Sequence, residues 1–193
     1  LAGISPGVLA RTTILFLGDN GTQNPATQPP FVAGHGKGSL FEGGVNVPLI
    51  VAGHSVRAAG RQCDALVNTT DLFATMAELA GVRAERVVPP DVTLDSLSLV
   101  PYLTNPELPS RRQFVYAEAF KPNHVLTKTT LRRAARGERY KLIVDSLTGV
   151  ERFFDLAADP FEHRDLLQGP MTQREWKAHS NLRRWIAAVV STQ

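Results

Sequence analysis

Residues 12–21 read Thr-Thr-Ile-Leu-Phe-Leu-Gly-Asp-Asn-Gly, an apolar run without alternation that ends in a polar turn sequence. An unbroken apolar run is typical of a strand buried on both faces of a sheet. Residues 47–51, Val-Pro-Leu-Ile-Val, predict a second such strand, with Pro48 tolerated near its start. Two doubly buried strands are not stable by themselves. We therefore expect the chain to be a piece of a larger α/β domain with further parallel strands and covering helices.

A helix is predicted over about residues 70–80, because Thr69 or Thr70 can cap its start and a glycine follows its end. Apolar residues recur on one side of it at helical spacing. Phe73 and Met76 are therefore expected in the core. A shorter helix is predicted over residues 98–103.

The second half of the chain has a different, antiparallel pattern with turn residues between short apolar segments. Strands are predicted over residues 113–120, 140–145 and 151–156, followed by an amphipathic helix over residues 172–190. The fold class is thus α/β with a small antiparallel subdomain. We place the domains at residues 1–108, the C-terminal part of an α/β domain, and 109–193, an antiparallel sheet with a terminal helix.

The composition is that of an ordinary globular protein, with 43% hydrophobic and 20% charged residues among 193 and a net charge of +3. The mild basic excess is spread along the chain, apart from Arg132, Arg133, Arg136 and Arg139, which we interpret as a solvated turn. No RNA-binding aromatic motif, zinc spacing or continuous basic helix accompanies them in the sequence, so nucleic-acid binding is not predicted.

The single cysteine, Cys63, excludes an internal disulfide and a cysteine-based zinc site. No apolar run in the sequence approaches the roughly 20 residues of a membrane helix, so no membrane partner is predicted. The sequence begins at Leu1 rather than Met, which leaves the compartment open.

Two polar segments are candidates for chemistry. Asp19 and Asn20 follow the end of the first predicted strand, where ligand sites of open α/β sheets gather, and both offer hard oxygen donors suited to Ca²⁺ or Mg²⁺. Asp-Asn-Gly is also a common turn sequence. Lys37 lies among glycines within the aperiodic segment 21–46, where an ammonium could hold an anionic oxygen or simply be solvated.

Together these segments resemble the sulfatase family of the alkaline phosphatase-like superfamily, in which Asp-Asn-Gly follows a strand and Gly-Lys-x-x-x-x-Glu-Gly-Gly-x-x-x-Pro precedes another. The matching residues are Asp19-Asn20-Gly21, Gly36-Lys37, Glu42-Gly43-Gly44 and Pro48. Downstream matches are Thr70-Asp71-Leu72-Phe73, Asp95, Ser98, Arg139-Tyr140-Lys141-Leu142, Phe154-Asp155-Leu156, Asp159-Pro160, Glu162 and Leu166. Each motif alone is weak, but the ordered set covers nearly the whole chain.

The resemblance implies that Asp19 and Asn20 are ligands of a divalent cation, usually Ca²⁺, and that Lys37 contacts the sulfate group. Cation and lysine would neutralise charge on the transferring sulfuryl oxygens. Residues 42–44 are interpreted as structural. The implied substrate is a sulfate ester of a small molecule or a sugar, and its identity is not readable from the sequence.

The chain departs from the family at the nucleophile, a formylglycine made from Cys or Ser in a Cys/Ser-x-Pro/Ala-x-Arg motif. Cys63 does not match this motif, nor does any serine. We expect the formylglycine, and the upstream metal ligands, on a missing N-terminal part, so that the isolated chain is inactive. Asn46 stands where family members often have Arg, and His35 matches no family position and is interpreted as a loop residue without a role.

Two alternatives stay open: a non-catalytic sulfatase-like domain or remnant, and a phosphonate or phosphate ester hydrolase of the same superfamily. The unpaired edges of the two buried strands predict self-association or a completing N-terminal polypeptide.

Overall fold

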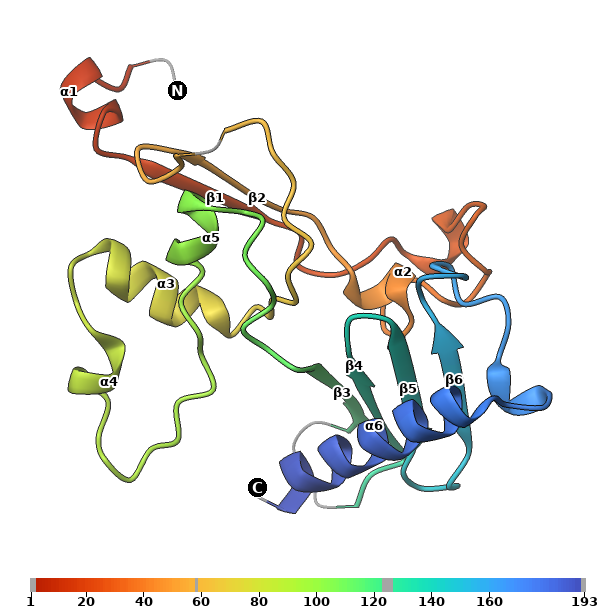
Figure 1. Ribbon diagram of the computed structural model, residues 1–193. Coiled ribbons are helices and arrows are strands. Elements are labelled where there is room, and N and C mark those ends of the chain that lie inside the picture. Colours follow the sequence, from red (N-terminus) through yellow and green to blue (C-terminus); the bar gives the residue numbers. More distant parts are fainter. Residues whose placement is uncertain (1–2, 58, 123–126, 192–193) are drawn as a thin grey trace. The chain divides into compact units, whose positions relative to one another are not determined.

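The computed structural model describes residues 3–57, 59–122 and 127–191. The chain forms two compact units (Figure 1). Unit 1 comprises Leu1–Leu17 and Leu49–Gln113, and unit 2 comprises Gly18–Pro48 and Phe114–Gln193. The long segment between the first two strands therefore belongs to the same unit as the second half of the chain.

Unit 1 contains a two-stranded sheet. Its strands β1 (Thr13–Leu17) and β2 (Leu49–Gly53) pair in antiparallel register, with Phe16 opposite Ile50. Both strands were predicted, but as doubly buried neighbours of parallel strands, and this is wrong for the described residues. Phe16 and Ile50 are each 58% exposed, because within these residues the sheet has two strands and no layer covers this side of it.

The helices of unit 1 are short. They are α1 (Pro6–Leu9), α3 (Asp71–Leu79), α4 (Ala84–Val87) and α5 (Val100–Thr104). The helices predicted over residues 70–80 and 98–103 correspond to α3 and α5, whereas α4 was not predicted. Thr70 is the N-cap of α3 but its side chain makes no capping bond, and Phe73 and Met76 are 48% and 54% exposed rather than in the core.

Unit 2 is built on an antiparallel sheet with strand order β3-β4-β5-β6. The strands are β3 (Val115–Lys121), β4 (Thr130–Arg136), β5 (Tyr140–Asp145) and β6 (Glu151–Asp155). Three were predicted, and β4 was not. Three of the arginines interpreted as a solvated turn lie in β4, where Arg133 pairs with Glu118 of the neighbouring strand at 2.9 Å. Arg139, which precedes β5, pairs with Asp155.

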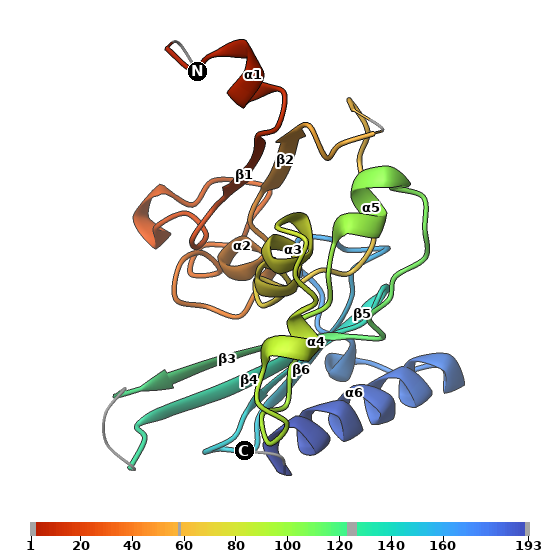
Figure 2. The ribbon, with the colours of Figure 1, turned by 90° about the vertical axis from the view of Figure 1, so that its left-hand side faces the viewer.

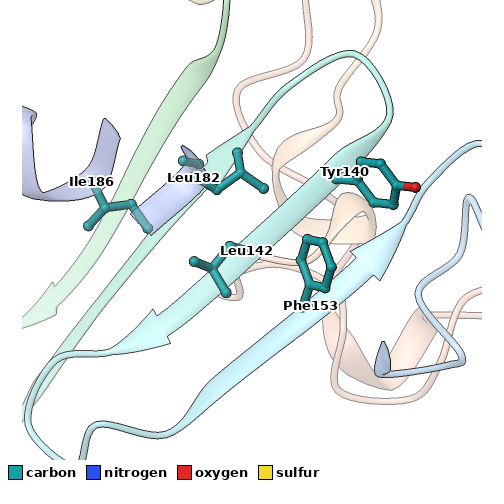
Figure 3. Packing of buried hydrophobic residues seen from close by; sticks show 6 residues of the cluster. Tyr140, Leu142, Phe153, Leu182 and Ile186 are labelled. Carbon is teal, nitrogen blue, oxygen red and sulfur yellow. The ribbon is translucent and has the colours of Figure 1, made fainter. Parts of the chain in front are cut away.

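The two faces of this sheet carry different cores, because side chains alternate along each strand. One face packs Leu142 and Phe153 against Leu182 and Ile186 of the C-terminal helix (Figure 3). On the other face, Ile143 and Phe154 pack with Leu40, which comes from the segment between β1 and β2. That segment is therefore held on the sheet by burial of apolar surface.

The C-terminal helix α6 (Gln173–Ser191) lies along the sheet of unit 2 (Figure 2). A capping box starts it, since the Glu175 carboxylate accepts a hydrogen bond from the Thr172 amide and the Glu175 amide donates to the Thr172 hydroxyl. The predicted α/β fold with an antiparallel sheet and a terminal helix is confirmed. None of the helices described here combines the length and hydropathy that a membrane span requires.

Asp155 gives a prediction for stability against pH. Its carboxylate accepts hydrogen bonds from Nε and Nη2 of Arg139, at 2.9 and 2.6 Å. Although burial by itself would raise the pKa of Asp155, these bonds and the backbone N–H groups of Ala157 and Ala158 hold it below its ordinary value. The stabilisation is therefore present above the pKa of the unfolded state, about 3.9, and is lost as pH falls through the lower pKa of the folded state.

We expect Asp155→Asn to lower the free energy of unfolding by about 1–3 kcal/mol at pH 7, because hydrogen bonds to a charged group are lost. The difference from the wild type should shrink below about pH 4. Urea unfolding followed by tryptophan fluorescence, at pH 7 and pH 3, measures both. Glu138→Gln, at an exposed position, is the control and should change stability by less than about 0.5 kcal/mol. An equal loss for Asp155→Asn at both pH values would contradict the prediction.

Candidate functional site

The candidate site is the loop of residues 18–48, which leaves the end of β1 and returns at the start of β2. Its two ends are joined by a hydrogen bond from the Gly18 amide to the Pro48 carbonyl, at 3.0 Å. Two short helical turns lie within it, η1 (Asn24–Ala26) and α2 (Glu42–Val45). Because this hydrogen bond joins its two ends, the loop begins and ends at neighbouring positions.

The three predicted site residues lie in this loop. Asp19 is exposed and Asn20 half-buried in the bend directly after β1. Lys37 is exposed in a turn, and its ammonium makes no ion pair with any residue that the structure describes. The side chains of Asp19 and Lys37 are therefore exposed to solvent, and that of Asn20 is partly so.

Backbone contacts bring the Asp-Asn-Gly and Gly-Lys segments together. The Lys37 amide donates to the Thr22 carbonyl at 2.8 Å, and the Gly21 amide donates to the Gly44 carbonyl at 3.0 Å. A Cβ atom at Gly21 would lie 1.8 Å from the Gly43 carbonyl oxygen, so only glycine permits this approach. The glycines of the two motifs thus let two backbone segments pack directly against each other.

Asn24 is a residue that sequence reasoning missed. Its side-chain oxygen accepts a hydrogen bond from the Gly36 amide at 2.9 Å, and its side-chain nitrogen donates to the Lys37 carbonyl at 3.3 Å. One amide side chain therefore holds the backbone on both sides of the Lys37 amide. An asparagine in a Gly- and Pro-rich loop is a weak signal, because such residues also form simple turns.

Two residues whose roles the sequence left open have structural contacts. The ring of His35 stacks on Phe41, with ring centroids 3.4 Å apart. Burial first, and then the positive charges of Arg152 and Lys141, lower the pKa of His35, which favours a neutral imidazole. Asn46 donates from its side chain to the Glu42 carboxylate at 3.0 Å, so it contributes to loop packing.

The oxygen donors of Asp19 and Asn20 are of the type that a hard divalent cation prefers, but they are too few to complete its coordination. Asp19 and Asn20 offer a carboxylate and an amide oxygen, the donors that Ca²⁺ prefers. Ca²⁺ takes about 6–8 oxygen ligands. Across the described residues, no group of three or more His, Cys, Asp or Glu side chains is arranged to hold a metal ion. Further ligands would have to come from elsewhere.

The family described as "N-sulphoglucosamine sulphohydrolase, C-terminal" matches residues 35–187, which include Lys37 and the whole of the unit 2 sheet. The chain belongs to this family. It is a sulfatase C-terminal domain. Choline-sulfatase from Rhizobium meliloti is 31% identical over 179 residues, which cover 91% of this chain and 31% of that protein. Arylsulfatase A from Bos taurus is 27% identical over 182 residues, covering 83% of this chain and 34% of that protein.

Solved structures agree with this assignment. A 2-O GAG sulfatase is 25% identical with a TM-score of 0.75, over 97% of this chain and 38% of that chain. Two more distant structures share the fold. One, 22% identical with a TM-score of 0.70 over 95% of this chain and 35% of that one, holds its substrate D-glucosamine-2-N,6-O-disulfate. The other is a phosphonate monoester hydrolase from Silicibacter pomeroyi, 20% identical with a TM-score of 0.58 over 81% and 30% of the two chains.

The sulfatase C-terminal domain described here spans about a third of the length of the curated relatives that it matches. Its Asp-Asn-Gly segment, residues 19–21, lies outside the matched range of 35–187. Backbone hydrogen bonds from Gly21 to Gly44, and from Lys37 to the following residue Thr22, join it to that range. The loop is therefore one local structure, although the family match covers only part of it.

Proposed function

We propose that this sulfatase C-terminal domain supplies one side of a sulfate-ester hydrolysis site. Asp19 and Asn20 serve as oxygen ligands of a divalent cation, usually Ca²⁺, and Lys37 contacts the sulfate group. The observation that supports the proposal is the packing of the two motifs: the Lys37 amide donates to the Thr22 carbonyl at 2.8 Å, so the backbone segments that carry the motifs lie next to each other. The side chains of Asp19 and Lys37 are exposed there.

Each residue has a chemical task that its side chain suits. The Lys37 ammonium holds an anionic sulfate oxygen as a point charge, and the surrounding glycines leave room for the ester to approach. The Asp19 carboxylate and the Asn20 amide oxygen bind and orient the cation. When bound, the cation supplies neutralisation of charge on the sulfuryl oxygens. Asn24 fixes the backbone beside Lys37 through its hydrogen bonds to the Gly36 amide and the Lys37 carbonyl.

The remaining parts of the site are proposed to lie outside this sequence. A formylglycine motif is absent from the 193 residues, and two metal donors fall short of the number that Ca²⁺ takes. The chain spans 31–34% of its curated relatives, which leaves room for those parts in a longer polypeptide. The exposed Phe16 and Ile50 of the β1–β2 sheet support a completing polypeptide that covers them.

One alternative has an observation in its favour. The fold is shared with a phosphonate monoester hydrolase, so a phosphonate or phosphate ester is the competing substrate. The family match and the higher identity to choline-sulfatase and arylsulfatase A favour the sulfate ester. A non-catalytic remnant is the second alternative, and it predicts no turnover of either ester.

A paired assay tests the proposal. The 193-residue chain alone is expected to show no turnover of an aryl sulfate, because a lysine and two ligands cannot replace the nucleophile. The protein purified from its native source is expected to hydrolyse the aryl sulfate faster than the matching aryl phosphonate. Peptide mass mapping of that protein should find a formylglycine peptide upstream of Leu1. Turnover by the isolated chain, or a native protein without such a peptide, would contradict the proposal.

A further inference from the structure

Lys141 is a buried lysine that the proposed chemistry does not use. It lies in β5, where Leu142 faces α6 and Lys141 faces the loop of residues 18–48, since neighbouring side chains point to opposite sides of a strand. Only 1% of Lys141 is exposed. A charged ammonium at such a position requires paired charges, because burial removes its hydration.

Two carboxylates supply those charges. The Lys141 ammonium lies 2.8 Å from Oε1 of Glu42 and 2.9 Å from Oε1 of Glu162. Glu42 comes from α2 of the loop, whereas Glu162 comes from the segment after β6. The second oxygen of Glu42 contacts Arg136 of β4 at 3.1 Å. Two acidic and two basic groups thus form a balanced set, the Glu42 cluster, defined as Glu42, Arg136, Lys141 and Glu162.

Glu162 is held in an unusual backbone conformation. Its φ of 59° makes it the one non-glycine residue with positive φ in residues 3–57, 59–122 and 127–191. Such conformations persist only where the surroundings enforce them. Its carboxylate accepts a hydrogen bond from the Glu42 amide as well as contacting Lys141. Glu162 therefore contacts two groups. One is the backbone amide of Glu42, and the other is Lys141, which is the partner of the Glu42 side chain.

The two glycines that follow Glu42 pack directly against the backbone of the candidate site, so the position of Glu42 affects that backbone. A Cβ atom at Gly43 would lie 2.7 Å from the His35 carbonyl oxygen, and one at Gly44 would lie 2.6 Å from that of Gly36. The Gly44 carbonyl also accepts the hydrogen bond from the Gly21 amide. A displacement of Glu42 would therefore move the backbone on both sides of the site, next to Lys37 and next to Asn20.

Buried ion pairs are weak evidence for stability, because desolvation offsets much of their attraction. Their better-supported use is to fix one arrangement of the groups that they join. We infer that Lys141, held between Glu42 and Glu162, is a positioning residue. It fixes the loop of residues 18–48, which carries the three candidate site residues, against the antiparallel sheet of unit 2. The inference rests on the proposed function only for the link from loop position to sulfate-ester hydrolysis.

Hydrogen exchange in the 193-residue chain tests the positioning role directly. In Lys141→Met, exchange at the amides of Gly21 and Lys37 is expected to accelerate about tenfold more than exchange at the β4–β5 ladder amides, because the loop opens locally. The matched control is Leu142→Ala, on the opposite face of the same strand. It should accelerate exchange by a similar factor at the loop and ladder amides, since it weakens the sheet that holds both.

Glu162→Gln keeps the test decisive if Lys141→Met does not fold. It retains the shape and a hydrogen-bond acceptor, and it should accelerate the same two amides to a smaller degree. Equal acceleration over all of unit 2 in the folded variants would overturn the positioning role.

Turnover separates this inference from the proposed function. The exchange measurement contains no sulfate ester, so its result stands whether or not the native protein is a sulfatase. Hydrolysis of an aryl sulfate by the wild-type native protein bears on the proposed function alone. Given such hydrolysis, kcat/KM is expected to be lower in Lys141→Met than in Glu162→Gln, and lower in both than in the wild type. An unchanged kcat/KM in folded Lys141→Met enzyme would overturn the inference.

Discussion

If the proposed function holds, Lys37→Ala is expected to lower kcat/KM for an aryl sulfate by about 10²–10³-fold in the full-length protein. The estimate is the usual effect of removing one preorganised group that stabilises charge in a transition state. The same change should alter the free energy of unfolding by less than about 0.5 kcal/mol, because the exposed ammonium makes no ion pair within the described residues. A large loss of activity without a loss of stability is therefore the expected pattern.

A matched control distinguishes a specific contact from general loss of positive charge. Lys177 is an exposed lysine of α6, in the same unit as Lys37. Lys177→Ala should leave kcat/KM unchanged. Lys37→Arg keeps the charge but replaces a compact ammonium with a planar guanidinium, so partial activity is expected. If Lys37→Ala kept more than about a third of the wild-type kcat/KM, a role in stabilising the transition state would be refuted.

Local patterns in the sequence predicted most elements of the fold. Tyr140–Asp145 was predicted with the bounds that β5 has, because its apolar residues lie between clear turn residues. Strand β4 was missed, because its arginines make the segment look polar although Ala134 and Ala135 within it are buried. The partner that makes Arg133 compatible with a half-buried strand, Glu118, is 15 residues away in the sequence. A local pattern does not contain that contact.

Burial was predicted less well than secondary structure. Apolar character placed Phe16, Ile50 and Phe73 in a core, yet each is between 48% and 58% exposed. Periodicity reports which side of an element is apolar, but it does not report whether another layer covers that side. Phe16 and Ile50 are accordingly the residues that support a completing polypeptide under the proposed function.

The candidate site was predicted at the level of residues but not of contacts. Motif order identified Asp19, Asn20 and Lys37 as candidates, and their roles stay predictions. The contacts around them were not readable, because Lys141 and Glu42 are 99 residues apart and meet only when the loop folds onto the sheet. Lys141 and Glu162 were noted merely as matches to a C-terminal motif. Their pairing gives a physical reason for that motif.

Asp71→Ala is expected to destabilise unit 1 by about 3–5 kcal/mol, the usual cost of removing one partner of a buried ion pair. Asp71 is 1% exposed, and its carboxylate accepts hydrogen bonds from the amides of Asn68 and Leu97, each at 2.8 Å. Nε and Nη2 of Arg112 also donate to this carboxylate, with Nε at 2.9 Å. Its removal would leave two backbone donors and a half-buried guanidinium without their acceptor.

An exposed ion pair of the same unit provides the control. Arg61 and Glu107 pair with side chains that are 50% and 72% exposed, so Glu107→Gln should cost less than about 1 kcal/mol. Hydrogen exchange at the α3 amides measures the effect in unit 1, since both tryptophans, Trp176 and Trp185, lie in α6 of unit 2. Asp71→Asn keeps one acceptor oxygen without the charge. Its destabilisation of unit 1 should therefore lie between that of Asp71→Ala and that of Glu107→Gln. Equal effects of Asp71→Ala and Glu107→Gln would show that the Asp71 contacts do not hold α3 in place.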